Sequence, residues 1–154
     1  MSTINDLLKG RIIGRSAESK YDELLKKAFN EETNQDDLTL LTEEEKVFYV
    51  LYTFDLEWNN GGLCQFFSNS SGDFAPLISK CLEEVGAKEH KKLYDSFINN
   101  NKINVNDLSF FKINYLEEFE DKVEAYPFDE FDDEYSQLDE LEDFIEKYYN
   151  EKLK

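Results

Sequence analysis

The segment from Thr42 to Trp58 constrains the fold more than any other, because apolar side chains surround nearly the whole of the helix that it predicts. The apolar residues of this segment are Val47, Phe48, Tyr49, Val50, Leu51, Tyr52, Phe54, Leu56 and Trp58. A helix that is apolar almost all round lies at the centre of a fold. Thr42, followed by Glu45 three positions later, predicts the helix start as a capping box. Gly61 and Gly62 predict its end, because glycine adopts the left-handed backbone that closes helices.

The rest of the chain shows mostly helical spacing of its apolar residues and little strand pattern. We expect an all-α fold, a compact single-domain bundle of about six to eight helices. Residues 1–41 are expected to supply N-terminal helices and a loop, in one globular unit with a helical domain at 42–151. The other predicted helices cover residues 4–9, a segment around 21–28, 73–86 with Asp73 as cap, 88–99, 108–126, and 138–149 after a break at Pro127. The loops are predicted at 30–39 and at 99–106, the latter as a hinge, with a short turn at 63–68.

The net charge of the chain indicates which kinds of molecule it can bind. The 154 residues include 35 acidic and 17 basic ones, a net charge of −18, and 15% of them are aromatic. The aromatic content favours a folded protein over an acidic disordered one. Such a charge repels nucleic acid and anionic membranes and attracts basic surfaces, of which the nucleic-acid-binding faces of proteins are the commonest. We therefore expect a basic protein as partner, with no direct binding of nucleic acid and no membrane association.

The two cysteines and the hydropathy indicate a reducing compartment. Cys64 and Cys81 form no CxxC pair, so neither a disulfide framework nor a zinc site is predicted. No secretion signal is recognisable near the N-terminus, and no segment approaches the roughly 18 apolar residues of a membrane span. These observations predict a cytoplasmic protein.

Acidic residues gather in the last third of the chain. Residues 115–151 contain 16 acidic residues against Lys122 and Lys147, a net charge of −14. At helical spacing, neighbours three or four apart lie about 5–6 Å from each other, and like charges there destabilise the helix. Solubility alone does not require such clustering, although an ordinary solvated face remains the alternative. The predicted partner-binding residues are Glu117, Glu118, Glu120, Asp121, Glu124, Asp129, Asp132, Asp133, Glu134, Asp139, Glu142 and Asp143.

A second motif lies where the central helix is expected to end. Residues 57–69 read EWNNGGLCQFFSN, and residues 85–87 read VGA. This combination resembles a helical family named after a bacterial DNA-mimic protein, whose hallmark is E-x-x-N-G-G-x-x-Q-F/Y-F-x-N followed by a helix ending in I/V-G-A. The residues that fit the first part are Glu57, Asn60, Gly61, Gly62, Gln65, Phe66, Phe67 and Asn69. Residues 131–135 are loosely similar to the family's acidic C-terminal element, and the resemblance covers residues 42–151.

The resemblance implies an all-helical fold and, from the family's described member, an acidic DNA mimic that occupies the DNA-binding face of a transcription factor. That member is dimeric, which leaves a homodimer open for this chain. From the residues themselves, the motif is interpreted as architecture, in which Gly61 and Gly62 reverse the chain and polar side chains satisfy helix ends. The alternative interpretation is a functional pocket lined by Glu57 and Gln65.

No catalytic constellation is apparent. His90 is the single histidine and lies near an apolar helix face, so we expect it at the edge of the core. A bundle-type metal site would need Glu-x-x-His, but Ala87 occupies the required position. Residues 129–140 have the length of a calcium loop, but Phe131 and Glu134 replace a ligand and the obligatory glycine. We therefore expect no catalytic residues, no metal and no cofactor.

The leading hypothesis is a non-enzymatic acidic binding protein, a DNA mimic that regulates transcription by covering the basic face of a partner. An immunity or antitoxin protein that neutralises a basic nuclease is the second hypothesis. An enzyme with a pocket near Glu57 and Gln65 is the third.

Overall fold

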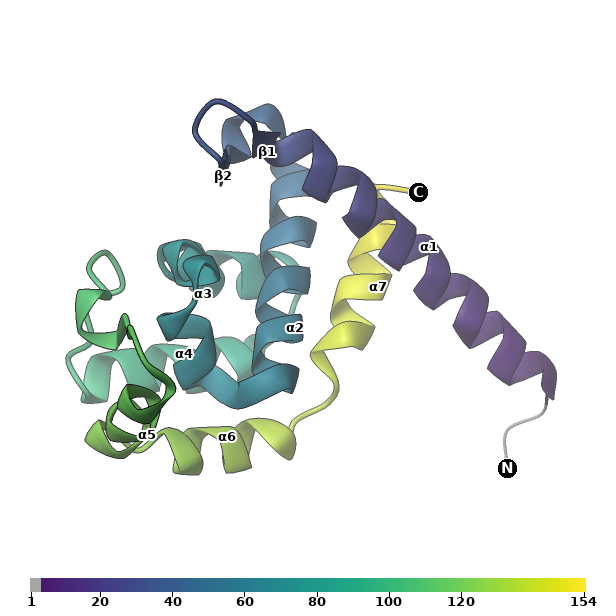
Figure 1. The fold of residues 1–154 in the computed structure, drawn as a ribbon. Helices are drawn as coiled ribbons and strands as arrows, with labels where there is room; N and C mark the ends of the chain where they lie inside the picture. Colours follow the sequence, from purple (N-terminus) through teal and green to yellow (C-terminus); the bar gives the residue numbers. More distant parts are fainter. Residues whose placement is uncertain (1–3) are drawn as a thin grey trace.

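The computed structural model describes the backbone of residues 4–154 and the side chains of residues 16–154. Within residues 4–154 it contains seven α-helices and one small hairpin, which confirms the predicted all-α bundle of six to eight helices. The longest helix, α2 (Glu43–Ser68), runs through the middle of the molecule, and the other helices surround it (Figure 1). Phe48, Leu51 and Phe54 of α2 are completely buried, as expected for a helix that is apolar nearly all round.

Two helices flank α2 on one side. These are α1 (Ile4–Ala28) and α7 (Leu141–Lys152), which also contact each other (Figure 1). We predicted separate helices at 4–9 and around 21–28, and this was wrong, because α1 is one helix whose backbone passes through Gly10 and Gly14. Glycine inside a helix costs only about 1 kcal/mol relative to alanine, so the two glycines do not break it.

The segment between α1 and α2 is not entirely loop. β1 (Phe29–Asn30) pairs antiparallel with β2 (Gln35–Asp36), and a 3₁₀ helix (Leu38–Leu40) follows. Asn34 takes a left-handed φ of 55° in the turn of this hairpin, a conformation that asparagine tolerates better than most residues.

Three further helices lie on the opposite side of α2 and below it. They are α3 (Ala75–Glu84), α4 (Lys88–Asn100) and α6 (Phe128–Ser136), and α6 crosses the lower end of α2 in Figure 1. The predicted cap Asp73 is wrong, because the 3₁₀ helix Ser70–Phe74 runs directly into α3 and places Asp73 inside the preceding turn. The segment predicted as a hinge forms a turn in which Ile103 is buried.

The predicted helix at 108–126 is also wrong. Its first part is the short 3₁₀ helix Ser109–Phe111, and only α5 (Leu116–Ala125) is α-helical. Phe111 packs in the core against Phe67 and Phe128, whereas Tyr115 is 70% exposed, so the two residues cannot share one buried helix face. Helix α6 was missed, because Pro127 was interpreted as a break and not as the residue that precedes a new helix.

Helix α2 bends at two glycines. Gly62 has a φ of 83°, in the left-handed region predicted for a helix end, and Gly61 departs from helical geometry beside it. The regular helix is interrupted at these glycines, as predicted, and a second helical segment continues at once from Leu63 to Ser68. This bend lets Phe66 and Phe67 enter the core, where both are completely buried.

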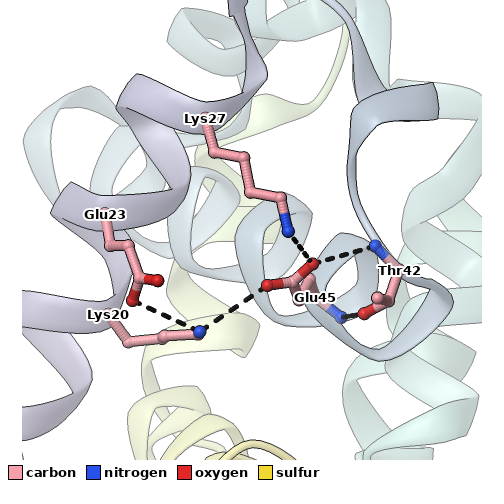
Figure 2. A network of polar contacts seen from close by, with 5 residues as sticks. All are labelled: Lys20, Glu23, Lys27, Thr42 and Glu45. Carbon is pink, nitrogen blue, oxygen red and sulfur yellow. Dashed lines mark hydrogen bonds and ion pairs between the residues drawn. The ribbon is translucent and has the colours of Figure 1, made fainter.

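A polar network holds α1 on the beginning of α2 (Figure 2). The predicted capping box is confirmed, since Thr42 Oγ1 accepts from Glu45 N and Glu45 Oε1 accepts from Thr42 N at 3.0 Å. The same carboxylate forms ion pairs with Lys27 at 2.9 Å and with Lys20 at 3.6 Å, both from α1. Burial by itself raises the pKa of Glu45, but the Thr42 hydrogen bond and the two lysines lower it to about 2.

Candidate protein-binding surface

The twelve predicted acidic residues lie on three helices and one turn. Helix α5 carries Glu117, Glu118, Glu120, Asp121 and Glu124; α6 carries Asp129, Asp132, Asp133 and Glu134; Asp139 lies in the turn before α7, which carries Glu142 and Asp143. Ten of them are exposed, while Glu118 and Asp132 are half-buried. Helices α5 and α6, which carry nine of the twelve, contact each other at the lower end of the molecule (Figure 1). Helix α7 follows α6 and runs upward beside α2 (Figure 1).

We call the predicted acids of α5 and α6, with the exception of Asp132, the α5–α6 acidic surface. Its members are Glu117, Glu118, Glu120, Asp121, Glu124, Asp129, Asp133 and Glu134. Glu130, a further exposed acid of α6, was not among the predicted residues.

The charge of this surface is not compensated within the part of the chain whose side chains are described. The ion pairs among residues 16–154 involve Glu23, Glu43, Glu45 and Asp95, and none of the twelve predicted acids. Lys122 is the one basic residue of α5 and α6, and its ammonium lies 4.1 Å from the centre of the Phe110 ring. The carboxylates of the α5–α6 acidic surface therefore face solvent without a basic neighbour that neutralises them.

Asp132 differs from the other predicted acids. Its Oδ1 accepts hydrogen bonds from Trp58 Nε1 at 2.9 Å and from Leu63 N at 3.1 Å. The second bond caps the helical segment that follows the bend of α2, although Asp132 belongs to α6. Burial raises the pKa of Asp132, and the two hydrogen bonds oppose that effect. The structure thus places Asp132 in the contact between two helices, apart from the exposed acids predicted with it.

The polar residues of the 57–69 motif bind one another. Glu57 Oε2 accepts from Asn69 Nδ2 at 2.7 Å and from Gln65 Nε2 at 3.3 Å, which ties the two parts of α2 across the bend. A Cβ atom at Gly62 would collide with the carboxylate of Asp132, and one at Gly61 would collide with the Gln65 side chain. Asn60 is exposed. Neither Glu57 nor Gln65 lines the cavities beside Asp55, Tyr135, Phe97 or His90.

The family model for DMP19-like protein matches residues 39–152, which is more than half of the chain. The chain belongs to the DMP19-like protein family. The resemblance given above on residues 57–69 and 85–87 is confirmed at the level of the family. No curated protein and no solved structure matches this DMP19-like chain.

The DMP19-like match begins at residue 39, so α1 and the hairpin lie outside it. The second half of α1 nevertheless packs against the core. Ala17, Leu24 and Ala28 of α1 are buried in the core, and Tyr21 Oη forms a 2.8 Å hydrogen bond with Thr53 Oγ1 of α2. The Glu45 network of Figure 2 adds a polar link between the same two helices.

His90 of the DMP19-like chain is 2% exposed and belongs to the core. Its Nε2–H donates to the backbone oxygen of Asp139 at 2.8 Å, because a carbonyl oxygen can only accept. Burial lowers the pKa of His90, so the ring is neutral at physiological pH. The bond holds the turn between α6 and α7 against α4.

The structure also reveals an acidic cavity that sequence reasoning missed. Asp55 lies on α2 between Phe54 and Leu56 and faces the beginning of α7. Burial, together with the charges of Glu142 and Glu140, raises the pKa of Asp55 to about 6. The sequence shows a carboxylate within an otherwise apolar helix, but it does not show that Glu142 of α7 and Glu140 just before α7 lie near it.

No helix within residues 4–154 has the length and apolar character needed to cross a membrane.

Proposed function

We propose that this DMP19-like chain is an acidic binding protein that occupies the basic nucleic-acid-binding face of a partner protein, as a DNA mimic. The observation that carries the proposal is the α5–α6 acidic surface, with exposed carboxylates that have no ion-pair partner among residues 16–154. Membership of the DMP19-like family supports it. The expected partner is a DNA- or RNA-binding protein such as a transcription factor.

Helical placement makes the acidic surface suited to this role. Phe128, Phe131 and Tyr135 anchor α6 in the core, and α5 packs against α6. Carboxylates on anchored helices keep their spacing, so little order has to be gained on binding. Neighbours three or four positions apart are separated by about 5–6 Å, which is of the order of the phosphate spacing in nucleic acid.

Electrostatics also predicts how such binding responds to salt. A cluster of like charges attracts a basic surface over roughly one Debye length, about 10 Å at 0.1 M salt. Affinity and association rate should therefore rise as salt is lowered and fall steeply as it is raised. A contact made mainly by apolar side chains would show little of this dependence.

The test compares two variants with equal changes in net charge. Asp133→Lys/Glu134→Lys alters the α5–α6 acidic surface and spares Asp132. Glu31→Lys/Glu32→Lys makes the same change in the turn of the hairpin, at the opposite end of the molecule (Figure 1). Proteins captured by the wild type from native lysate at low salt are eluted by a salt step and identified by mass spectrometry. The captured protein is then assayed for nucleic-acid binding with each variant as competitor.

The proposal expects a captured nucleic-acid-binding protein, displaced from its nucleic acid by the wild type and by the hairpin variant. The Asp133→Lys/Glu134→Lys variant should compete poorly while it unfolds at the wild-type temperature. Equal competition by all three proteins, or binding that survives high salt, would show that the α5–α6 acidic surface is not the contact.

A further inference from the structure

A cavity of about 120 Å³ lies between α2 and the turn that joins α6 to α7. Asp55, Trp58 and Asn59 line it from α2, and Tyr135, Asp139 and Glu140 line it from the other side. A neighbouring cavity of about 140 Å³ shares Asp55 and Asn59 and extends toward Glu142 and Glu146 of α7. The α5–α6 acidic surface lines neither cavity.

The buried hydroxyl of Tyr135 gives this cavity a feature that a cluster of acids alone does not have. Its side chain is 5% exposed, and its hydroxyl is buried with no hydrogen-bond partner among the described residues. A buried hydroxyl without a partner costs about 1–3 kcal/mol, so natural proteins rarely leave one. The hydroxyl is close enough to Asp55 and Glu140 for their charges, after burial, to raise the pKa of Tyr135 well above its usual value. The phenol therefore stays neutral and offers lone pairs to a donor.

The walls of the cavity favour a positively charged guest. Asp55 is half-buried, and no ion pair within residues 16–154 involves it or Glu140. The Trp58 and Tyr135 rings are 4.2 Å apart, and aromatic faces attract ammonium and guanidinium groups. Among the described residues, no three His, Cys, Asp or Glu side chains are placed to hold a metal ion. An organic cation, whose N–H groups need acceptors in several directions and which is attracted by an aromatic wall, fits these groups better than a metal does.

We propose that this cavity binds an organic cation with a primary ammonium or guanidinium head group. The N–H groups of the guest donate to the Tyr135 hydroxyl and to the Asp55 carboxylate, and the rings of Trp58 and Tyr135, which pack on each other with centroids 4.2 Å apart, form one wall beside it. This goes beyond DNA mimicry, because it concerns a different face of the molecule and a guest of a few heavy atoms. The cation belongs either to a free amine or to a lysine or arginine side chain of a bound protein.

Trp58 can report binding by its fluorescence, because it is the single tryptophan of the 154 residues and lines the cavity. Trp58 fluorescence is titrated at pH 8 and low salt with cadaverine, as a free amine. It is also titrated with the blocked amino acids Nα-acetyl-lysine methylamide and Nα-acetyl-arginine methylamide, as models of protein side chains. A saturable change with cadaverine as the tightest probe indicates a free amine, and one with a blocked amino acid as the tightest indicates a partner's side chain.

Three substitutions test the assignment to this cavity. Asp55→Asn and Tyr135→Phe each remove one proposed contact at nearly constant volume, and each should weaken binding by about tenfold, as expected for a hydrogen bond to a charged group. Glu31→Gln removes one negative charge from the exposed hairpin turn and should leave binding unchanged. Circular dichroism confirms that the three variants are folded.

Absence of a saturable fluorescence change with every probe would overturn the proposal. So would equal affinities of the three variants, because the total charge of the protein would then explain the binding. If Tyr135→Phe binds the probe as tightly as the wild type while Asp55→Asn does not, the cation is not bound in this cavity. The Asp133→Lys/Glu134→Lys variant should bind the preferred probe like the wild type, so DNA mimicry and cation binding fail separately.

Discussion

The indole Nε1–H of Trp58 donates to Oδ1 of Asp132 at 2.9 Å and joins α2 to α6. The same oxygen accepts from Leu63 N, the first donor after the bend of α2. One carboxylate thus satisfies two donors that would otherwise be left without partners when the helices pack. Asp132 is a structural residue in the middle of an acidic stretch.

The first prediction separates Asp132 from its acidic neighbours. Asp132→Ala removes a helix cap and leaves the Trp58 N–H without an acceptor, so it should destabilise the protein by about 1–3 kcal/mol. Asp132→Asn retains one acceptor oxygen and should cost less. Urea unfolding followed by Trp58 fluorescence measures both, with the exposed Asp133→Ala as control. Equal stabilities of Asp132→Ala and Asp133→Ala would contradict the role given to Asp132.

The glycines of the molecule provide a graded second prediction. Gly62→Ala should be the most damaging, because φ is 83° and the new Cβ would collide with the Asp132 carboxylate. Gly86 has a φ of 80° with open space around it, so Gly86→Ala should cost only the backbone strain, about 1–2 kcal/mol. Thermal unfolding should therefore rank wild type, Gly86→Ala and Gly62→Ala in descending order of stability. A reversal of the last two would show that the collision with Asp132 is relieved at little cost.

The sequence could predict features that depend on neighbours along the chain. The Thr42–Glu45 capping box, the buried face of α2 and the left-handed Gly62 follow from local patterns, and all three are present. Features that join distant segments were missed. In the sequence, Asp132 looks like one more surface acid, and only the position of α6 beside Leu63 shows its role. Likewise, the raised pKa of Asp55 depends on Glu142 of α7 and on Glu140 just before α7. Tyr115 fits the helical period of Phe111 but is exposed, because packing overrides spacing there.

The third prediction concerns the contact of α1 with α2 (Figure 2). The pKa of Glu45 is about 2 in the folded protein and ordinarily 4.5, so its ionised form stabilises the fold. That contribution is complete above about pH 5 and is lost as pH falls through 4.5 toward 2. Glu45→Gln lacks it, so we expect a loss of about 2 kcal/mol at pH 7 that shrinks as pH approaches 2.

Urea unfolding of the Glu45→Gln variant from pH 2.5 to pH 7 measures this difference. Glu43→Gln is the matched control, because Glu43 lies in the same first turn of α2 but its side chain is 80% exposed. A constant difference between Glu45→Gln and the wild type across this range would mean that neither the Thr42 hydrogen bond nor the two lysines of α1 lower the pKa of Glu45 in the folded protein.

The last prediction concerns Asp55, whose pKa is raised in the folded protein, whereas that of Glu45 is lowered. Burial and the charges of Glu142 and Glu140 raise its pKa to about 6 from 3.8, so the folded protein binds this proton more tightly than the unfolded chain. The stability linked to that proton is present below about pH 4 and is lost as pH rises through 6. Asp55 lines two cavities, of which Glu146 of α7 lines one and Tyr135 of α6 the other, and among residues 16–154 no basic side chain lines either of them. Ionised Asp55 therefore adds electrostatic strain to the folded protein.

Asp55→Asn should remove this strain and stabilise the protein by about 2 kcal/mol at pH 8, with little difference from the wild type near pH 4. Thermal and urea unfolding at both pH values measure the effect, with Asp133→Asn as the control for removal of one exposed negative charge. In the wild type, saturating cadaverine should raise the unfolding temperature more at pH 8 than at pH 5, because ionised Asp55 is the form that binds a cation. If Asp55→Asn is both more stable at pH 8 and unresponsive to cadaverine, then the carboxylate that destabilises the folded protein is also the one that binds the cation. Equal stabilisation by Asp55→Asn and Asp133→Asn would instead assign the effect to general repulsion among the acids of the protein.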